Sequence, residues 1–254
     1  MMTSMDGATG SGDPQLLPGV VVTSITPDPD TVQAAAMLIV LLAAEGANVA
    51  AMVPVETGVD DACEAGSSGA LVRWAAAHMD DPRHVTPFAL SAARSTMHAA
   101  DAEKTLLHGA AFDRAREDLC DGRTVLVVAD TIGMLDPITP SLTMLDLTAR
   151  WQLSAVLVEP VSRWSLGHLR LLAVALQARG AAITGVILTA PPDDDADLLT
   201  AVRDTVAALL DCPVLVLPRV QSAHDRAELL SAAQQCGMTR LVSRMGIGTL
   251  PPAA

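Results

Sequence analysis

The sequence predicts an α/β fold: a single doubly wound domain whose mostly parallel sheet is flanked by helices on both faces. Short apolar runs alternate along the chain with helical patterns of 3.6-residue period, which is the signature of βαβ units and a parallel sheet. A chain of 254 residues is also long enough to enclose one large core. We expect the first apolar run, Gly19–Ser24, to lie in the middle of the sheet.

The expected strands are short runs rich in Val, Ile, Leu and Ala. They are Gly19–Ser24, Val49–Val55, Thr124–Asp130, Ser154–Val158, Ile183–Thr189 and Pro213–Pro218. Ligands of doubly wound sheets bind beyond the carboxyl ends of the strands. The loops that follow these runs are therefore the first places to look for a functional site.

Helical patterns fill the gaps between the strands. They are expected over Pro29–Ala44, Ala99–Cys120, Ser165–Arg179 and Ala196–Leu210. Gly46 closes the first of them, and the third starts at a Ser165 cap and stops before Gly180. The acidic run Asp193–Asp195 precedes the last one and suits the positive end of a helix dipole.

Residues 17–248 are expected to form the domain, because no internal repeat or linker divides them. Residues 1–16 are polar and rich in Gly and Ser without a basic start, so we expect a disordered tail and not a secretory signal. Residues 249–254 are expected to be a C-terminal tail. No apolar run reaches the ~18 residues that are typical of a membrane span.

The composition limits the classes of partner. The net charge is −13, whereas affinity for nucleic acid depends on clustered Lys and Arg, so no nucleic-acid partner is expected. The same charge would repel an anionic membrane surface. The four cysteines have no CxxC pair and no matching His spacing, which is typical of reduced structural thiols in a cytosolic protein. We therefore expect a cytoplasmic location.

The loop between the first strand and the first helix, Ser24–Val32, lies where a nucleotide-binding α/β protein carries its phosphate loop. Such a loop needs glycines, whose N–H groups close on phosphate, and a lysine. This loop has no glycine, its two prolines lack an N–H, and Asp28 and Asp30 would repel phosphate. Lys104, the single lysine of the sequence, is far away along the chain. The pattern predicts a kinase-like site that has lost its phosphate-binding groups.

Five further segments resemble, in sequence and in order along the chain, the motifs of a known family. They are Met52–Gly58 (MVPVETG), Val127–Leu135 (VVADTIGML), Trp164–His168 (WSLGH), Gly185–Leu188 and Pro213–Val220 (PVLVLPRV). In that order they resemble the segments K-P-V-x-S/T-G, V-V-E-G-A-G-G-L-L, G-T-x-N-H, G-V-x-L-N and P-x-L-G-x-L-P-R-L of dethiobiotin synthetases, which are P-loop NTPases. The resemblance runs from about Gly19 to Val220, and the first strand, loop and helix match the family without a gap.

The resemblance implies an activity and an assembly. Family members join carbon dioxide to 7,8-diaminononanoate and close the ureido ring of dethiobiotin, with ATP and magnesium. The substrate carbamate attacks the γ-phosphate of ATP, and ring closure follows. The family also implies a homodimer in which the second subunit completes the substrate site. The segments near Leu142–Trp151 and Trp164–Leu176 are apolar enough to pack outward in such a dimer.

Most of the family's functional positions hold other residues here. The P-loop lysine position falls on Thr31, the metal-binding threonine on Val32, and two loop glycines on Ser24 and Asp30. The second family lysine becomes Val53, the aspartate after Gly66 becomes Ser67, the magnesium-binding glutamate becomes Ala129, and the purine-reading asparagine becomes Thr189. The catalytic set and the metal ligands are thus predicted to be absent, and ATP and Mg²⁺ are expected to bind poorly.

Two groups of positions remain as candidate sites. Thr57 and Gly58 are predicted to bind substrate, because Thr57 matches a hydroxyl that contacts substrate in the family. The vestigial nucleotide site is predicted at Thr26, Asp30, Thr31, Val32, Thr189, Pro218, Arg219 and Val220.

Several polar residues suggest a chemical role but have a simpler structural explanation. Asp28, Asp30 and Asp130 could hold a divalent cation, but helix and turn capping explains them better. Ser165, His168 and Asp146 invite a triad interpretation, yet no nucleophile-elbow glycines surround the serine. Arg163, Arg219 and Lys104 are expected to be solvated surface charges.

Two functional hypotheses follow from the sequence. The first is a catalytically inactive dethiobiotin-synthetase-like protein that binds a small molecule or a protein partner. The alternative is an active ATP-dependent dethiobiotin synthetase with a remodelled nucleotide site, which Thr57, Thr31, Arg219 and the clustered aspartates could support. The sequence leaves open whether any nucleotide binds, which ligand or partner is recognised, the oligomeric state, and whether Asp28, Asp30 or Asp130 replace the lost metal ligands.

Overall fold

A computed structural model of the protein describes residues 17–190 and 195–245. The tails expected at 1–16 and 249–254, and the acidic residues Asp193 and Asp194, lie outside the described residues. The central sheet has six strands in the order β10-β9-β8-β1-β5-β2, and every neighbouring pair in it is parallel. The first strand, β1 (Gly19–Thr23), is flanked by β8 and β5, as predicted.

The other strands are close to their predicted bounds. They are β2 (Val49–Met52), β5 (Val125–Ala129), β8 (Ser154–Pro160), β9 (Ile183–Thr189) and β10 (Val214–Val216). Short strands form two small additional sheets: β3 (Val55–Thr57) with β4 (Phe88–Leu90), and β6 (Pro137–Thr139) with β7 (Leu142–Thr143).

The predicted strand over Val49–Val55 is wrong in its second half. It divides into β2 and β3, which belong to different sheets. The division falls at Val53 and Pro54, where Val53 N–H donates to the carbonyl of Val85 instead of to a sheet neighbour (2.8 Å). Proline has no N–H to give to a ladder, so the strand cannot continue through position 54. As a result β3 and Thr57 turn towards the loop that precedes α4.

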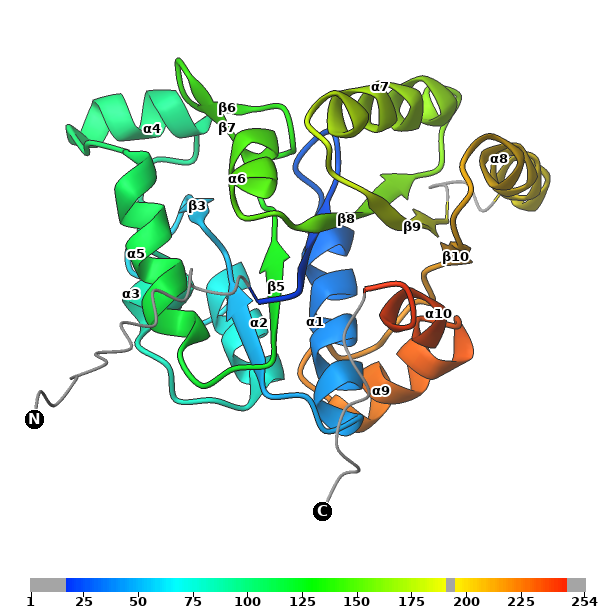
Figure 1. Ribbon diagram of the computed structural model, residues 1–254, viewed down its shortest axis with the longest axis horizontal. Helices are drawn as coiled ribbons and strands as arrows, with labels where there is room; N and C mark the ends of the chain where they lie inside the picture. Colours follow the sequence, from blue (N-terminus) through cyan, green and yellow to red (C-terminus); the bar gives the residue numbers. More distant parts are fainter. Residues whose placement is uncertain (1–16, 191–194, 246–254) are drawn as a thin grey trace, which may run out of the picture.

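The helices cover both faces of the sheet (Figure 1). They are α1 (Pro29–Ala44), α2 (Ser68–Ala76), α3 (Pro82–Val85), α4 (Thr96–Glu103), α5 (Gly109–Cys120), α6 (Met144–Arg150), α7 (Ser165–Ala178), α8 (Ala196–Leu209), α9 (Arg226–Gln235) and α10 (Thr239–Val242). Helix α1 packs between α2 and α9 on one face, and α7 and α8 pack together on the opposite side. Among the described residues no helix is long and apolar enough to cross a bilayer.

Two details of the helices differ from prediction. The stretch Ala99–Cys120 breaks into α4 and α5, because Lys104 adopts a left-handed conformation (φ 57°) and ends α4. Ser165 is not the N-cap of α7, because Trp164 takes that place without a side-chain cap bond. The Ser165 hydroxyl instead accepts from Ser162 N–H (2.8 Å) and donates to the Pro160 carbonyl (3.2 Å).

The apolar side chains of the segment near Leu142–Trp151 do not pack outward as expected. Met144, Leu147 and Trp151 are at most 2% exposed and belong to the core. The Trp151 indole N–H donates to Asp113 (2.9 Å), which satisfies its polar atom inside the fold. In α7, by contrast, Leu171 and Val174 are about half exposed.

Candidate functional site

In the loop that follows β1, the polar side chains form hydrogen bonds with other groups of the same loop. Ser24 Oγ donates to the Thr26 carbonyl (2.5 Å), and Thr31 Oγ1 donates to Ser24 Oγ (3.1 Å). Asp28 is the N-cap of α1, and its carboxylate accepts from Asp30 N–H (2.7 Å), while Pro29 begins the helix without an N–H. This confirms the predicted capping role of Asp28. An anion binds at a helix N-terminus through free N–H groups. Here the Asp28 carboxylate already accepts from one of them, the Asp30 N–H, as a bound anion would.

The loop after β5 packs directly against this first loop. Met134 N–H donates to the Ser24 carbonyl (2.9 Å), and Gly133 has φ 97°. A Cβ at Gly133 would lie 2.8 Å from the carbonyl oxygen of Ile25, so only glycine permits this approach. The two loops are therefore packed tightly against each other next to the start of α1.

Asp130 is a buried structural carboxylate. Its Oδ1 accepts from the N–H groups of Ile132 and Gly133 (3.0 Å each), and its Oδ2 accepts from Thr23 Oγ1 (2.6 Å). Burial raises the pKa of Asp130 from its ordinary value of 3.8 to about 6. Both oxygens are occupied by protein donors, which supports capping of the turn over metal binding.

Glu56 is a second carboxylate of this kind, and sequence reasoning missed it. It lies next to Thr57 and is 6% exposed. Its oxygens accept from Ser68 N–H (2.5 Å) and Gly69 N–H (3.0 Å), so it caps the first turn of α2 beside Ser67. The sequence shows only a glutamate after an apolar run, and this does not reveal the capping role.

The residues present do not fit ATP and Mg²⁺. The two lysine positions hold Thr31 and Val53, and the glutamate position holds Ala129, all of them fully buried. Neither a cation nor a free carboxylate is therefore presented to a nucleotide there. In the described part of the chain, no group of three or more His, Cys, Asp or Glu residues is placed to hold a metal ion.

A cavity of about 350 Å³ lies beside this loop, at the carboxyl edge of the sheet. It is lined by Pro27, Thr57, Ala93, Arg94, Ser95, Thr96, Thr131, Ile132 and Asp136. The predicted substrate residue Thr57 lies in this lining. Gly58 does not, but its φ of 79° and its N–H bond to the Leu90 carbonyl (2.7 Å) form the turn that ends β3.

Most of the vestigial nucleotide residues meet at a second cavity of about 260 Å³. It is lined by Asp30, Gln33, Thr189, Ala190, Leu217, Pro218, Arg219 and Val220. Three predicted residues lie elsewhere: Thr26 is exposed on the loop, Thr31 is bonded to Ser24, and Val32 packs in the core.

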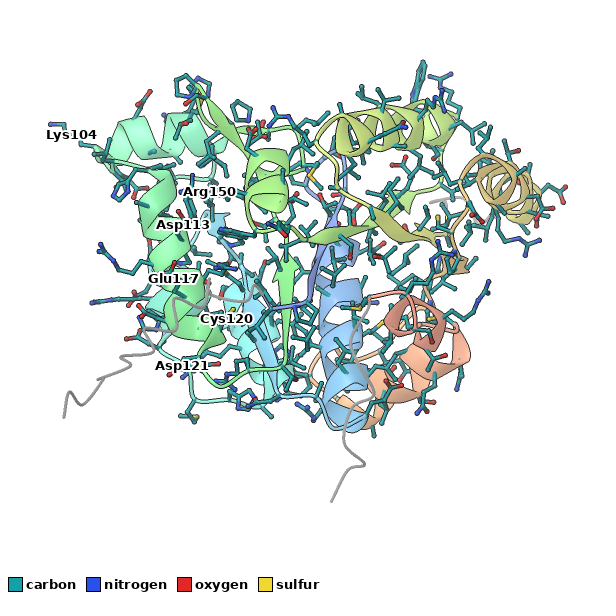
Figure 2. The ribbon with its side chains drawn as sticks, in the orientation of Figure 1. Lys104, Asp113, Glu117, Cys120, Asp121 and Arg150 are labelled. Atoms are coloured by element: carbon teal, nitrogen blue, oxygen red, sulfur yellow. The ribbon has the colours of Figure 1, made fainter. Side chains whose placement is uncertain are left out.

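The remaining polar candidates have structural partners. His168 Nδ1 lies 3.0 Å from Oε1 of the buried Glu159, while Asp146 pairs with Arg179 and caps α6, so no triad with Ser165 forms. Figure 2 shows Lys104 at the outer end of α4, directed away from the body of the molecule. The same view shows Asp113 and Arg150, which form an ion pair.

Comparison with known proteins identifies the relatives of this chain. The AAA domain family matches residues 20–226. An ATP-dependent dethiobiotin synthetase from Novosphingobium aromaticivorans is 30% identical over 164 residues, which is 64% of this chain and 74% of the relative. Another from Anaeromyxobacter dehalogenans is 26% identical over 217 residues, or 84% of this chain and 96% of the relative. A third, from Nitrobacter hamburgensis, is 41% identical over 61 residues, covering 24% of this chain and 29% of the relative.

Proposed function

The chain belongs to the dethiobiotin synthetase family of P-loop NTPases, and from that premise we propose that it is a member that binds a small molecule without using ATP. It keeps the family's sheet and the cavity that contains Thr57. The observation that carries the proposal is the loop at 24–32, whose polar groups bond to one another and in which the Asp28 carboxylate already accepts from the Asp30 N–H at the start of α1.

Electrostatics support the loss of catalysis. Phosphoryl transfer depends on cations that neutralise the transferring group, and the two family lysine positions hold Thr31 and Val53. A carboxylate within ~4 Å of a phosphate charge costs about 4 kcal/mol at an effective dielectric near 20. Asp28 and Asp30 at the start of α1 bring this repulsion to the place where phosphate would sit.

The test is a direct assay with 7,8-diaminononanoate, bicarbonate, ATP and Mg²⁺. The Novosphingobium relative serves as the positive control under the same conditions. We expect dethiobiotin from the control only, together with no ATP binding to this protein at micromolar concentration in a calorimetric titration. Dethiobiotin formation at a rate near the control's would overturn the proposal. It would favour an active synthetase with a remodelled nucleotide site, for which the cavity at Thr189 and Arg219 is the natural place.

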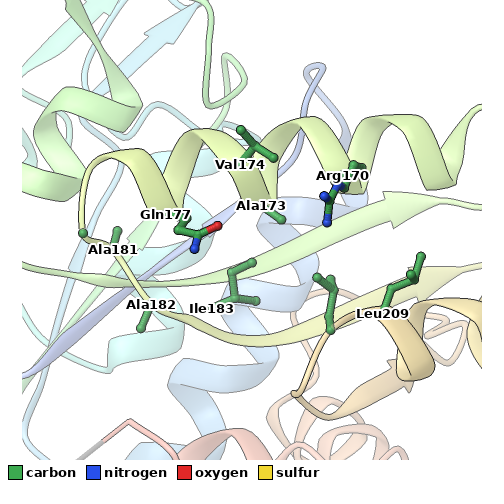
Figure 3. Close-up of a pocket in the computed structure, with 10 residues that line it drawn as sticks. Arg170, Ala173, Val174, Gln177, Ala181, Ala182, Ile183 and Leu209 are labelled. Atoms are coloured by element: carbon green, nitrogen blue, oxygen red, sulfur yellow. The ribbon is translucent and has the colours of Figure 1, made fainter.

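We also propose that the protein is a cytoplasmic homodimer that associates through α7 and α8. The cytoplasm suits the four free thiols. Between the two helices lies a groove of about 470 Å³ (Figure 3), and its lining includes Val174, Ile183 and Leu209. Trp164, Leu166 and Leu171 extend the exposed apolar surface along α7.

Sedimentation equilibrium tests this assembly. We expect a dimer at micromolar concentration and a monomer for the double variant Leu171→Glu, Val174→Glu. Leu106→Glu is the matched control, because Leu106 is 80% exposed and lies outside α7 and α8. A monomeric unmodified protein would contradict the proposal.

A further inference from the structure

Glu159 is a buried carboxylate whose partner is a histidine side chain. It lies near the end of β8 and is 1% exposed. Its Oε1 lies 3.0 Å from Nδ1 of His168, which belongs to the start of α7. Its Oε2 is one of the buried side-chain atoms that have no hydrogen-bond partner among the described residues. Asp28, Glu56 and Asp130, by contrast, all accept from backbone N–H groups.

The groups around Glu159 make its charge depend on His168. Burial raises the pKa of Glu159, and the hydrogen bond and charge of His168 oppose this rise. The Ser165 hydroxyl of α7 also lowers this pKa, although it donates to the Pro160 carbonyl (3.2 Å). Asp28, at the start of α1, is a like charge that raises the pKa of Glu159 further. The imidazole of His168 is therefore the positive group that can compensate the buried carboxylate.

The sign of the pH effect follows from this arrangement. A pKa of Glu159 above its ordinary value of 4.5 means that the folded protein keeps a proton that the unfolded chain releases. The stabilisation is thus fully present below pH 4.5 and is lost as pH rises through the folded pKa. Deprotonation of the imidazole acts in the same direction, because the buried carboxylate then loses its positive partner.

The pair lies where α7 begins, and a different contact holds the end of this helix. Helix α7 packs on β8 (Figure 1). The buried residues of the helix form one stripe: Ser165, Leu169, Leu172 and Leu176. Beyond that stripe, Arg179 forms an ion pair with Asp146 of α6. Arginine keeps its charge at every pH of interest, so only the start of α7 is held by a contact that titrates near neutral pH.

We propose that the His168–Glu159 pair is a proton-operated latch, which holds the start of α7 against β8 while the imidazole is protonated and loosens it when the proton leaves. The inference goes beyond the small-molecule binding proposed above. Leu171 and Val174 lie on the same helix, so the latch links pH to the surface through which we propose that two copies associate. The latch itself does not require that association.

Hydrogen–deuterium exchange of the full chain tests the latch. Amide protection is measured at about pH 6 and about pH 8 and corrected for the intrinsic exchange rate at each pH. We expect the protection of residues 169–172 to fall by about fivefold or more at the higher pH, since the charged donor becomes neutral. Residues 175–178, next to the Arg179 ion pair, are the internal reference and should change little. Equal protection of residues 169–172 at both pH values would overturn the inference.

Matched variants assign the effect to the pair. Glu159→Gln removes the buried charge at nearly constant shape, so the protection of residues 169–172 should no longer differ between the two pH values. His168→Gln leaves the carboxylate without a cation, so protection at about pH 6 should fall towards the value of the wild type at about pH 8. His84→Gln is the control, because His84 pairs with Asp118 on the surface (3.5 Å) and lies outside α7.

The control should keep the pH difference of the wild type. A pH difference in Glu159→Gln as large as that of the wild type would refute the assignment to this pair. The exchange measurement uses neither ATP nor substrate, so its outcome is independent of the dethiobiotin assay.

Discussion

Residue by residue, the carboxylates at the carboxyl edge of the sheet divide into those that hold the backbone and those that remain open. Asp28 caps α1 and Glu56 caps α2, while Asp130 holds the turn after β5. Each of these carboxylates accepts at least one backbone N–H, which offsets part of the free energy lost when its charge leaves water. The Asp136 carboxylate lacks such donors in the described part of the chain.

The first prediction concerns the charge of Asp130. Its pKa in the folded state, about 6, exceeds the ordinary value of 3.8, so the folded protein binds a proton more readily than the unfolded chain. The contribution of this group to stability therefore falls as pH rises from about 4 to about 6, by at most ~3 kcal/mol. Asp130→Asn should remove this contribution. Its free energy of unfolding should equal or exceed that of the wild type at pH 7, and the difference should shrink as pH falls to 4.

The geometry explains why asparagine is tolerated at position 130. Its amide oxygen accepts from Ile132 and Gly133 as before, and the Thr23 hydroxyl, which also lies 3.3 Å from the Ser24 carbonyl, can turn to accept from the amide. Asp130→Ala leaves those donors without an acceptor and should cost ~2–4 kcal/mol. Urea unfolding at a series of pH values measures both variants. A difference between wild type and Asp130→Asn that is constant with pH would contradict the raised pKa.

The second prediction concerns the orphan hydroxyl of Thr96. Replacing it with the methyl group of valine removes an unsatisfied buried polar atom, so Thr96→Val should raise the free energy of unfolding by ~1 kcal/mol. Thr148→Val is the control, because Thr148 is equally buried but donates to the Met144 carbonyl (2.7 Å). That variant should be no more stable than the wild type. Equal destabilisation of the two in urea unfolding would show that Thr96 has a partner.

Sequence reasoning finds such residues only when the partner is local. The capping role of Asp28 could be predicted because Pro29 and Asp30 follow it directly. Glu56, Thr96 and Asp136 could not, because their surroundings come from segments far along the chain. The hydrogen-bonding state of a side chain is set by tertiary contacts, which local patterns do not contain.

At the scale of elements, two helices end in residues that strain the backbone. Ala77 closes α2 at φ 58° and Lys104 closes α4 at φ 57°, both in the left-handed region. A Cβ atom is disfavoured in that conformation, whereas glycine adopts it freely. These positions explain why the helical pattern over Ala99–Cys120 did not reveal its break, since no glycine marks the end of α4.

The third prediction follows from these helix ends. Ala77→Gly and Lys104→Gly should each raise the free energy of unfolding by ~1 kcal/mol, because strain is relieved at the C-cap. Ala201→Gly, at an exposed interior position of α8, should lower it by a similar ~1 kcal/mol. Thermal or urea unfolding of the three variants checks the opposite signs.

At the scale of the whole molecule, the order of the strands brings the candidate residues together. β1 lies between β5 and β8, so the loops after these strands converge at one edge. Alternating strands and helices made this arrangement predictable from the sequence, as did the position of β1 in the middle. The packing of the loop after β5 over the loop after β1 was not predictable, because it depends on a backbone approach at Gly133.

The last prediction is that a single substitution does not restore nucleotide binding. Thr31 is fully buried and bonded to Ser24, so the ammonium group of Thr31→Lys would displace this bond inside a closed, acidic loop. We expect a loss of ~1–3 kcal/mol in stability and ATP affinity no tighter than millimolar. Thr31→Val, which removes the hydroxyl at constant shape, is the control for the lost hydrogen bond.

The minimum repair restores the loop glycines, both lysines and the carboxylate together. It is the five-fold variant Ser24→Gly, Asp30→Gly, Thr31→Lys, Val53→Lys, Ala129→Glu. It should gain ATP binding but lose further stability, because Val53 and Ala129 are completely buried and their replacements are charged. Calorimetry with ATP and Mg²⁺ beside urea unfolding measures both quantities, and micromolar ATP affinity in Thr31→Lys alone would refute the closed-loop explanation.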